Sequence, residues 1–256
     1  MSPLEIIALG SASLLAGAVN AVAGGGTLLS FPAAVALGLP PIVANASNAV
    51  AMTPGSLASA WGYRRELRQD RKIVTLLLPP AVLGGVCGAG LLLLTPQRVF
   101  DAVVPILVLG AVALLLVQNL RQRAKDAPAD EPWLLPARTS ASLGLQFLVG
   151  VYGGYFGAGM GIMTLALLSM LNGRNIHRMN GVKIVLGAFV NGFASVGFAL
   201  ANAVDWRATA VMAVGVSLGG WGGAELARKL DARKVRWGVV ILGIGIAAAL
   251  ARKTWF

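Results

Sequence analysis

The chain has 256 residues, of which 57% are hydrophobic and only 12% are charged, and its mean hydropathy is +0.76. Soluble domains carry about 25% charged residues, so this composition excludes a water-soluble fold of this size. It also excludes a disordered chain, which would be polar, and a disulfide scaffold, because Cys87 is the only cysteine. We therefore expect an all-α, polytopic membrane protein.

The net charge of +11 comes from 21 Lys and Arg against 10 Asp and Glu. These basic residues lie almost entirely in the short gaps between apolar runs. That placement is typical of topology signals and of contacts with lipid headgroups. We expect membrane lipid as a partner and no nucleic acid.

Eight apolar runs of about 20 residues are long enough to cross a bilayer as helices. They are Leu4–Ala23, Ile42–Tyr63, Ile73–Leu94, Val99–Leu120, Thr139–Ala158, Ile176–Leu200, Arg207–Ala227 and Val235–Ala251. The first has no basic residue before it, so we expect it to be a helix of the mature protein rather than a cleaved signal. Two shorter runs, Thr27–Leu37 and Gly161–Leu171, each follow a glycine cluster. At the helical rise they are too short to span unaided, and the sequence leaves open whether they span or are re-entrant.

The order of long and short runs occurs twice, and Gly24 aligns with Gly157 at an offset near 133 residues. The runs therefore predict two membrane repeats, each with four long helices and one short helix after a glycine-rich break. We expect the first repeat at residues 1–123, a polar cytoplasmic linker at 124–136, and the second repeat at 137–256.

The basic loops predict the orientation of the repeats. Five basic residues lie in Arg64–Lys72 and five in Arg228–Arg236, and the central segment Arg121–Arg138 is also basic, whereas Thr95–Arg98 has one and Ala201–Trp206 has none. Positive-inside reasoning puts the first three in the cytoplasm and the other two outside. Equivalent loops then face opposite sides, so the repeats have inverted topology and both termini are outside.

Inverted repeats are typical of secondary transporters, whose binding site lies near the midplane where helices break. Backbone N–H groups at the start of the short runs carry a positive partial charge that suits a small anion. Polar residues predicted at membrane depth include Thr53, Asn191 and Ser195. Asn45 and Asn48 share a helix face, as do Asn180 and Lys183. The candidate substrate-binding residues are Asn20, Gly24, Gly25, Gly26, Thr27, Asn45, Ser47, Asn48, Gly157, Gly159, Gly161, Asn180 and Lys183.

Plainer interpretations stay open for these residues. The glycines could serve only close helix packing, the asparagines only interhelical hydrogen bonds, and Lys183 could reach the headgroups. Five tryptophans lie near predicted helix ends, as in interfacial belts, whereas Trp221 lies inside a predicted span and is assigned to packing.

We expect no catalytic residue, metal site or cofactor. One histidine and one cysteine do not supply the three or four ligands of a metal site. Carboxylates are scarce, and only Glu225 beside Arg228 approaches membrane depth. Neither a membrane-depth histidine nor a pair of core carboxylates is present to support an enzyme.

The stretch from Gly17 to Pro32 (GAVNAVAGGGTLLSFP), followed by Ala44–Asn48 (ANASN), resembles the TauE/SafE sulfite exporter family. The second half, Gly150–Gly161 (GVYGGYFGAGMG), is similar to the family's repeat. The resemblance covers nearly the whole chain and implies a bacterial inner-membrane permease for sulfite, sulfonates such as sulfoacetate, or related organosulfur acids. A passive anion channel and a non-transporting membrane subunit are the alternatives, and a homodimer stays open.

Overall fold

The helices of the chain follow the predicted apolar runs, which confirms the all-α fold class. The computed structural model describes residues 1–22, 24–121, 139–171, 175–226 and 232–255, and these form helices and connecting turns with no strand among them. The linker predicted at 124–136 lies outside the described residues. The helices are α1 (Pro3–Val22), α2 (Thr27–Ala36), α3 (Pro41–Gly62), α4 (Arg64–Gln69), α5 (Arg71–Leu94), α6 (Gln97–Arg121), α7 (Thr139–Tyr155), α8 (Met160–Met170), α9 (Ile176–Leu200), α10 (Trp206–Leu226) and α11 (Ala232–Trp255).

Two local differences from the predicted elements have simple causes. The segment expected as a basic loop contains the short helix α4, whose Arg, Glu, Leu and Gln residues are all good helix formers. Helix α7 ends at Tyr155 instead of Ala158, because Gly157 has a positive φ of 76° that a right-handed helix cannot continue.

Four described helices are long and apolar enough to cross a membrane: Pro3–Val22, Arg71–Leu94, Gln97–Val117 and Ile176–Leu200. Helices α2 and α8 are apolar but shorter, as the sequence predicts. Helix α3 is long enough but more polar than these four, since it carries the amides and hydroxyls of Asn45, Ser47, Asn48, Thr53, Ser56 and Ser59. These side chains have to be satisfied within the protein, because lipid offers them no hydrogen bonds.

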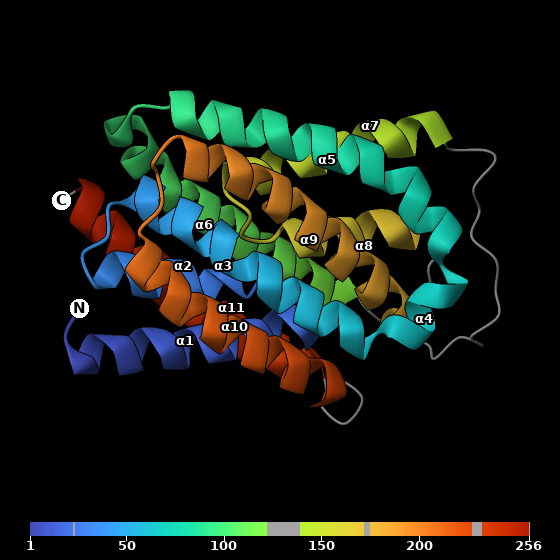
Figure 1. Cartoon of the computed structure of the whole chain (residues 1–256), viewed down its shortest axis with the longest axis horizontal. Helices are drawn as coiled ribbons and strands as arrows, with labels where there is room; N and C mark the ends of the chain where they lie inside the picture. Colours follow the sequence, from blue (N-terminus) through green and yellow to red (C-terminus); the bar gives the residue numbers. More distant parts are fainter. Residues whose placement is uncertain (23, 122–138, 172–174, 227–231, 256) are drawn as a thin grey trace.

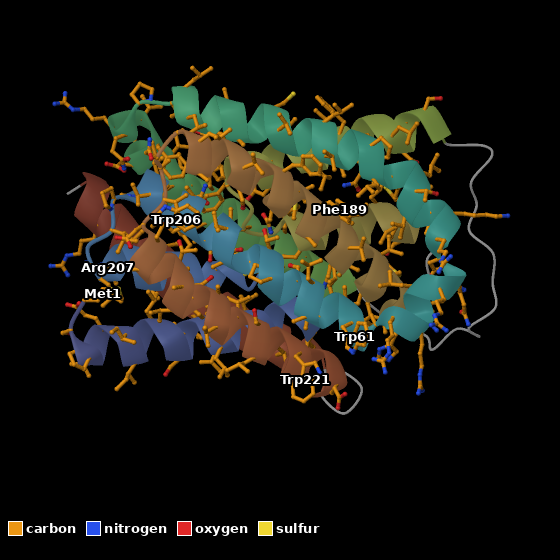
Figure 2. All side chains as sticks on the ribbon, in the orientation of Figure 1. Met1, Trp61, Phe189, Trp206, Arg207 and Trp221 are labelled. Atoms are coloured by element: carbon orange, nitrogen blue, oxygen red, sulfur yellow. The ribbon has the colours of Figure 1, made fainter. Side chains whose placement is uncertain are left out.

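Large apolar side chains cover the outside of the helices, as expected of a surface in contact with lipid (Figure 2). Trp61 and Trp221 point outward toward one end of the molecule, and Trp206 lies at the other end beside Arg207. Trp221 is 55% exposed, so the assignment of this residue to packing is wrong. Its place near the end of α10 fits the amphipathic indole of an interfacial belt.

The two interrupted helix pairs open toward opposite ends of the molecule. In Figure 1, α1 begins and α2 ends at the end where both chain termini lie, so this pair forms a hairpin open on that side. Helix α7 begins and α8 ends at the opposite end, where α4 lies. Helix α3 and helix α9 then cross the middle of the molecule from opposite ends.

Glycines let the helices of the two interrupted pairs approach their neighbours at backbone distance. Along the contact of α5 with α7, a Cβ added to Gly84 or Gly88 would lie 2.1 Å from Phe147 O or 2.0 Å from Val151 O. Along the contact of α1 with α10, a Cβ on Gly219 would lie 1.9 Å from Leu14 O. Such close approach is the main source of helix association where both helices face lipid-like surroundings.

Replacing Gly88 by Ala should therefore destabilise the protein, while Gly90→Ala in the same helix should not. The methyl group that Gly88→Ala adds would force α5 and α7 apart, and overpacking of this kind costs about 1–3 kcal/mol. A Cβ at Gly90 meets nothing within 4 Å and improves helix propensity. Thermal unfolding of the detergent-solubilised variants checks this: equal melting temperatures would contradict the packing role.

Candidate functional site

The breaks of the two interrupted pairs meet in the interior. Gly24, after α1, and Gly157, after α7, have nearly the same positive φ, 74° and 76°, which L residues with a side chain rarely adopt. A Cβ added to Gly161, in the first turn of α8, would lie only 3.4 Å from the Cα of Gly24. The matched glycines thus turn the chain at corresponding points and leave the breaks of the two hairpins in contact.

A small enclosed cavity lies where the breaks meet. Its volume is about 20 Å³, roughly enough for one water molecule. Both halves of the chain contribute to its lining, which consists of Asn20, Gly25, Thr27, Met52, Ser56, Gly157, Met160, Gly161, Lys183, Ile184, Gly187 and Asn191. Thr27 and Gly161 belong to the first turns of α2 and α8, where backbone N–H groups have no acceptor within their own helix.

Lys183 brings a positive charge to this cavity from the middle of α9. The residue is only 3% exposed, and its Nζ donates to Asn20 O at 3.0 Å and to Asn180 Oδ1 at 2.9 Å. A Cβ on Gly161 would lie 3.2 Å from Lys183 Cδ, so the aliphatic part of the lysine lies against the start of α8. Lys183 therefore stays inside the protein and does not extend to the lipid headgroups.

The last carbonyls of α1 hold the lysine and its neighbours in place. Asn20 O accepts from Lys183, Val22 O accepts from Asn180 Nδ2 at 3.4 Å, and Ala21 O accepts from the hydroxyl of Tyr63 at 3.3 Å. The last four carbonyls of a helix lack intrahelical donors and carry negative partial charge, which favours a cation beside them. Tyr63, between α3 and α4, and two side chains of α9 thus satisfy the carbonyls at the end of α1.

Two amides of α3 bind the two breaks, Asn48 the first and Asn45 the second. Asn48 Oδ1 accepts from Ser30 Oγ at 2.6 Å, and Asn48 Nδ2 donates to Thr27 Oγ1 at 3.4 Å, so this amide binds the start of α2. Asn45 Nδ2 donates to Tyr155 O, the last residue of α7, at 3.0 Å. Each of these asparagines therefore satisfies polar groups next to a break.

Not every predicted site residue reaches the cavity. The predicted residues that line the cavity are Asn20, Gly25, Thr27, Gly157, Gly161 and Lys183. Four others lie one layer behind it, in contact with the breaks: Gly24, Asn45, Asn48 and Asn180. Gly26 packs against Ala16 and Asn20, and Gly159 starts α8 beside Ala111. Ser47 lies away from the cavity, where its Oγ accepts from Asp205 N at 2.9 Å.

Sequence reasoning missed part of the lining. Met52, Ser56, Met160, Ile184 and Gly187 were not predicted, and Asn191 was noted only as a polar residue at membrane depth. A constant spacing between residues of α3 and residues of α9 is a signal that could have found several of them. Asn45 and Asn180, Met52 and Gly187, and Ser56 and Asn191 are each 135 positions apart (45 to 180, 52 to 187, 56 to 191).

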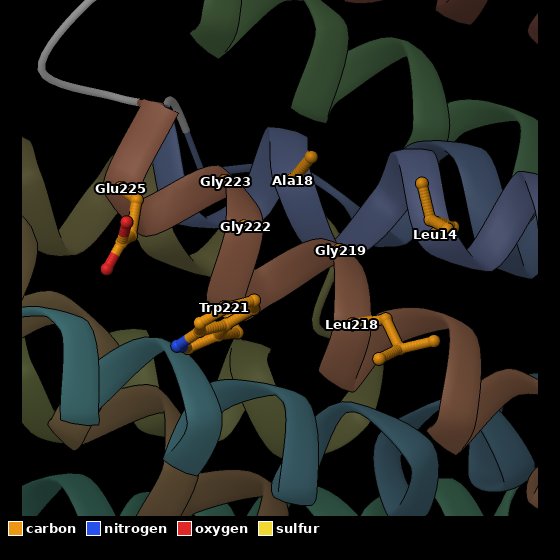
Figure 3. A pocket seen from close by; sticks show the side chains of 8 residues that line it. All are labelled: Leu14, Ala18, Leu218, Gly219, Trp221, Gly222, Gly223 and Glu225. Atoms are coloured by element: carbon orange, nitrogen blue, oxygen red, sulfur yellow. The ribbon is translucent and has the colours of Figure 1, made fainter.

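Larger hollows lie on the outer surface. Two grooves of about 440 Å³ and about 590 Å³ follow the contact between α1 and α10. The first is shown in Figure 3, between Leu14 and Ala18 of α1 and Trp221 and Glu225 of α10. The exposed side chains along both grooves are mostly apolar, so these grooves suit lipid rather than a polar solute.

The model of the sulfite exporter TauE/SafE family matches residues 9–250. The chain belongs to the TauE/SafE sulfite exporter family. Curated relatives are similar over nearly their full length. A probable membrane transporter protein of Haemophilus influenzae is 27% identical over 93% of this chain and 91% of its own, and the probable membrane transporter protein YfcA of Escherichia coli K12 is 28% identical over 98% and 91%.

A third relative, the probable membrane transporter protein ORF9 of a Sinorhizobium species, is 27% identical over 93% of this chain and 89% of its own. No solved structure is significantly similar to the chain. The TauE/SafE family is one of membrane transporters, and this confirms the predicted general function, a membrane transporter for a small solute.

Among the described residues, no group of three or more His, Cys, Asp or Glu side chains could hold a metal ion. The polar groups of the cavity are instead amides, hydroxyls, backbone N–H groups and one ammonium. These are hydrogen-bond donors for the most part, as recognition of an anion requires.

Replacing Asn48 by Ala should loosen the first break. Loss of the amide leaves the buried hydroxyls of Ser30 and Thr27 without one partner each, and an unsatisfied buried group costs about 1–3 kcal/mol. We expect a lower melting temperature in detergent for Asn48→Ala than for Gln69→Ala, which removes an exposed amide. Equal melting temperatures would show that this network does not support the break.

Proposed function

We propose that the chain transports small anions, namely sulfite, sulfonates such as sulfoacetate or related organosulfur acids, across the bacterial inner membrane by alternating access. The observation that carries the proposal is the small cavity at the meeting of the two breaks, which is lined by Lys183 and by residues of the first turns of α2 and α8. Positive charge from a lysine and from two helix N-termini favours an anion over a cation.

Each part of the lining has a role in this proposal. Backbone N–H groups near Gly24–Thr27 and Gly159–Gly161 cradle the anion. The amides of Asn45, Asn48 and Asn180 hold the cradle in shape, and Asn20 and Asn191 reach the cavity directly. Lys183 compensates the charge of the solute, exchanging its contacts with Asn20 O and Asn180 for contacts with the bound anion.

The size of the cavity supports alternating access. A space for about one water molecule is too small for sulfite, which has four non-hydrogen atoms, so the solute enters only when one side opens. A channel would instead need a continuous open path. Two repeats of inverted topology, residues 1–123 and 137–256, provide the means, since they can exchange inward-facing and outward-facing arrangements. The opposite openings of the α1–α2 and α7–α8 hairpins support this duplication.

The basic residues supply the orientation. Helix α4, with exposed Arg64, Arg65 and Arg68, lies at the end opposite both termini (Figure 1). Positive-inside reasoning puts this end in the cytoplasm and both termini in the periplasm. An anion leaving a negative interior gains about 2.3 kcal/mol per charge per 100 mV, which favours export.

A non-transporting membrane subunit is the alternative that one observation favours. The amides of Asn45 and Asn48 are hydrogen-bonded to other protein groups, as a purely structural role would require. A buried ammonium beside an enclosed cavity is what this alternative does not explain, because an intramembrane charge is costly and usually functional.

Uptake of sulfite and sulfoacetate into proteoliposomes tests the proposal. We expect saturable uptake by the wild type, loss of at least about 90% of it in Lys183→Ala because the solute charge is no longer compensated, and little change in Lys72→Ala. Lys72 is an exposed lysine at the start of α5 and serves as the matched control.

Each other outcome has a definite meaning. Equal saturable flux in wild type and Lys183→Ala would remove the lysine from the mechanism. Flux that does not saturate would favour a channel, and absence of flux for both anions would contradict the proposed substrate class.

A further inference from the structure

An ion pair between a buried aspartate and a partly buried arginine joins the two halves of the chain on the α4 side of the cavity. Arg178, in the first turn of α9, donates from Nε to Asp70 Oδ1 and Oδ2 at 3.1 and 3.0 Å, and its Nη2 also contacts Oδ1. Asp70 lies between α4 and α5, and its side chain is fully buried. The sequence did not indicate this pair, because the carboxylate lies in a segment expected to be a loop.

A continuous layer of side chains connects this pair to the cavity. Ile184 lines the cavity and also packs with Ala21 and Tyr63 in a buried cluster, against which Leu67 lies. One turn before Ile184 in α9, a Cβ added to Gly181 would lie 3.4 Å from Leu67 Cγ. Arg178 and Asp70 follow directly after this layer. The α3–α4–α5 corner and the start of α9 therefore pack together on this side of the cavity, and the ion pair is one of their contacts.

The opposite side of the cavity is closed by aromatic rings. Phe31, one turn after Thr27 in α2, makes an edge contact with Phe156 at a centroid distance of 5.3 Å. Phe100 of α6 packs on both Phe156 and Tyr155, at 6.3 and 5.8 Å. Phe156 directly precedes Gly157, which lines the cavity. The closure on this side thus consists mainly of aromatic rings, and the described residues named in it carry no charge.

The two closures respond differently to water. Two charges that are buried as a pair lose hydration on closing, so a pair of this kind contributes little net stability and regains hydration when it separates. Aromatic rings that become exposed to water gain no favourable hydration of this kind, because burial of their apolar surface is favourable. The side closed by Asp70 and Arg178 therefore opens at lower cost when water or a charged solute arrives.

We propose that the Asp70–Arg178 pair is the cytoplasmic gate of the transporter and that the solute anion opens it by competing with Asp70 for Arg178. A guanidinium binds a carboxylate through a two-oxygen contact, and a sulfonate or sulfite can offer two of its three oxygens to the same pair of N–H groups. In the closed state Asp70 thus binds Arg178, and the solute oxyanion displaces it when the gate opens. This inference rests on the proposed function for the identity of the solute, but the gate itself can be tested without any solute.

The test measures access to the cavity from each side of the membrane. In a Cys87→Ser background, which removes the only cysteine of the chain, Ser56→Cys places a small reporter thiol in the cavity lining. Labelling with a membrane-impermeant maleimide is followed in inside-out and in right-side-out vesicles. Asp70→Asn, the charge exchange Asp70→Arg with Arg178→Asp, and Asp101→Asn are compared in this background. Asp101 is a carboxylate in α6 that accepts from Gln97, and it supplies the same substitution away from the gate.

We expect Asp70→Asn to raise the labelling rate by roughly tenfold or more in inside-out vesicles only, because Arg178 then loses the ionic contact that joins the corner to α9. The charge exchange should restore slow labelling, and Asp101→Asn should leave it unchanged. An unchanged rate in Asp70→Asn, or a rise of equal size in both kinds of vesicle, would overturn the gate, since the latter marks a pair that supports the whole fold. Because no solute is present, a failure of anion uptake would leave this result intact.

Discussion

A helix that stops in the interior of a membrane protein leaves carbonyl groups that lipid cannot satisfy, and the end of α1 is such a place. Its last carbonyls, from Asn20 to Val22, accept hydrogen bonds from Lys183, Asn180 and Tyr63. Two of these donors belong to α9, in the other half of the chain. The break in the first half is therefore completed by the second half, and neither break keeps its geometry without the other.

This dependence explains why the polar residues gather at the centre while glycines line the helix contacts around it. Glycines along α5, α7, α1 and α10 bring the backbones of α5 and α7, and of α1 and α10, together without side chains between them. The buried ammonium of Lys183 and the amides of Asn45, Asn48 and Asn180 lie where the breaks meet. Beyond them, one side is closed by an ion pair and the other by aromatic rings. The chemistry at the two sides of the cavity thus differs.

The sequence predicted the helices well because the length of an apolar run indicates where a membrane helix begins and ends. The run Ile176–Leu200 is α9 as the structure has it, and Thr27–Leu37 differs from α2 by one residue. The sequence singled out Lys183 as a charge within an apolar run but left open whether it reaches the headgroups, and its burial beside Asn20 and Asn180 decides between the two. What could not be predicted were contacts between distant segments: Asp70 and Arg178 are 108 positions apart, and no local pattern pairs them. Ser56 and Gly187 were missed because small residues give no signal of their own, and only their alignment with Asn191 and Met52 marks them.

The central claim is that a small oxyanion binds where the two breaks meet, beside Lys183. Equilibrium binding of sulfoacetate to the purified protein, measured by calorimetry, tests it through a pair of glycines. Gly161→Ala places a methyl group 3.2 Å from Lys183 Cδ, whereas Gly144→Ala in α7 places one in open space. The account predicts that Gly161→Ala weakens binding by about tenfold or more, an effect of about 1.4 kcal/mol, and that Gly144→Ala binds like the wild type. Equal affinity in all three proteins would contradict it.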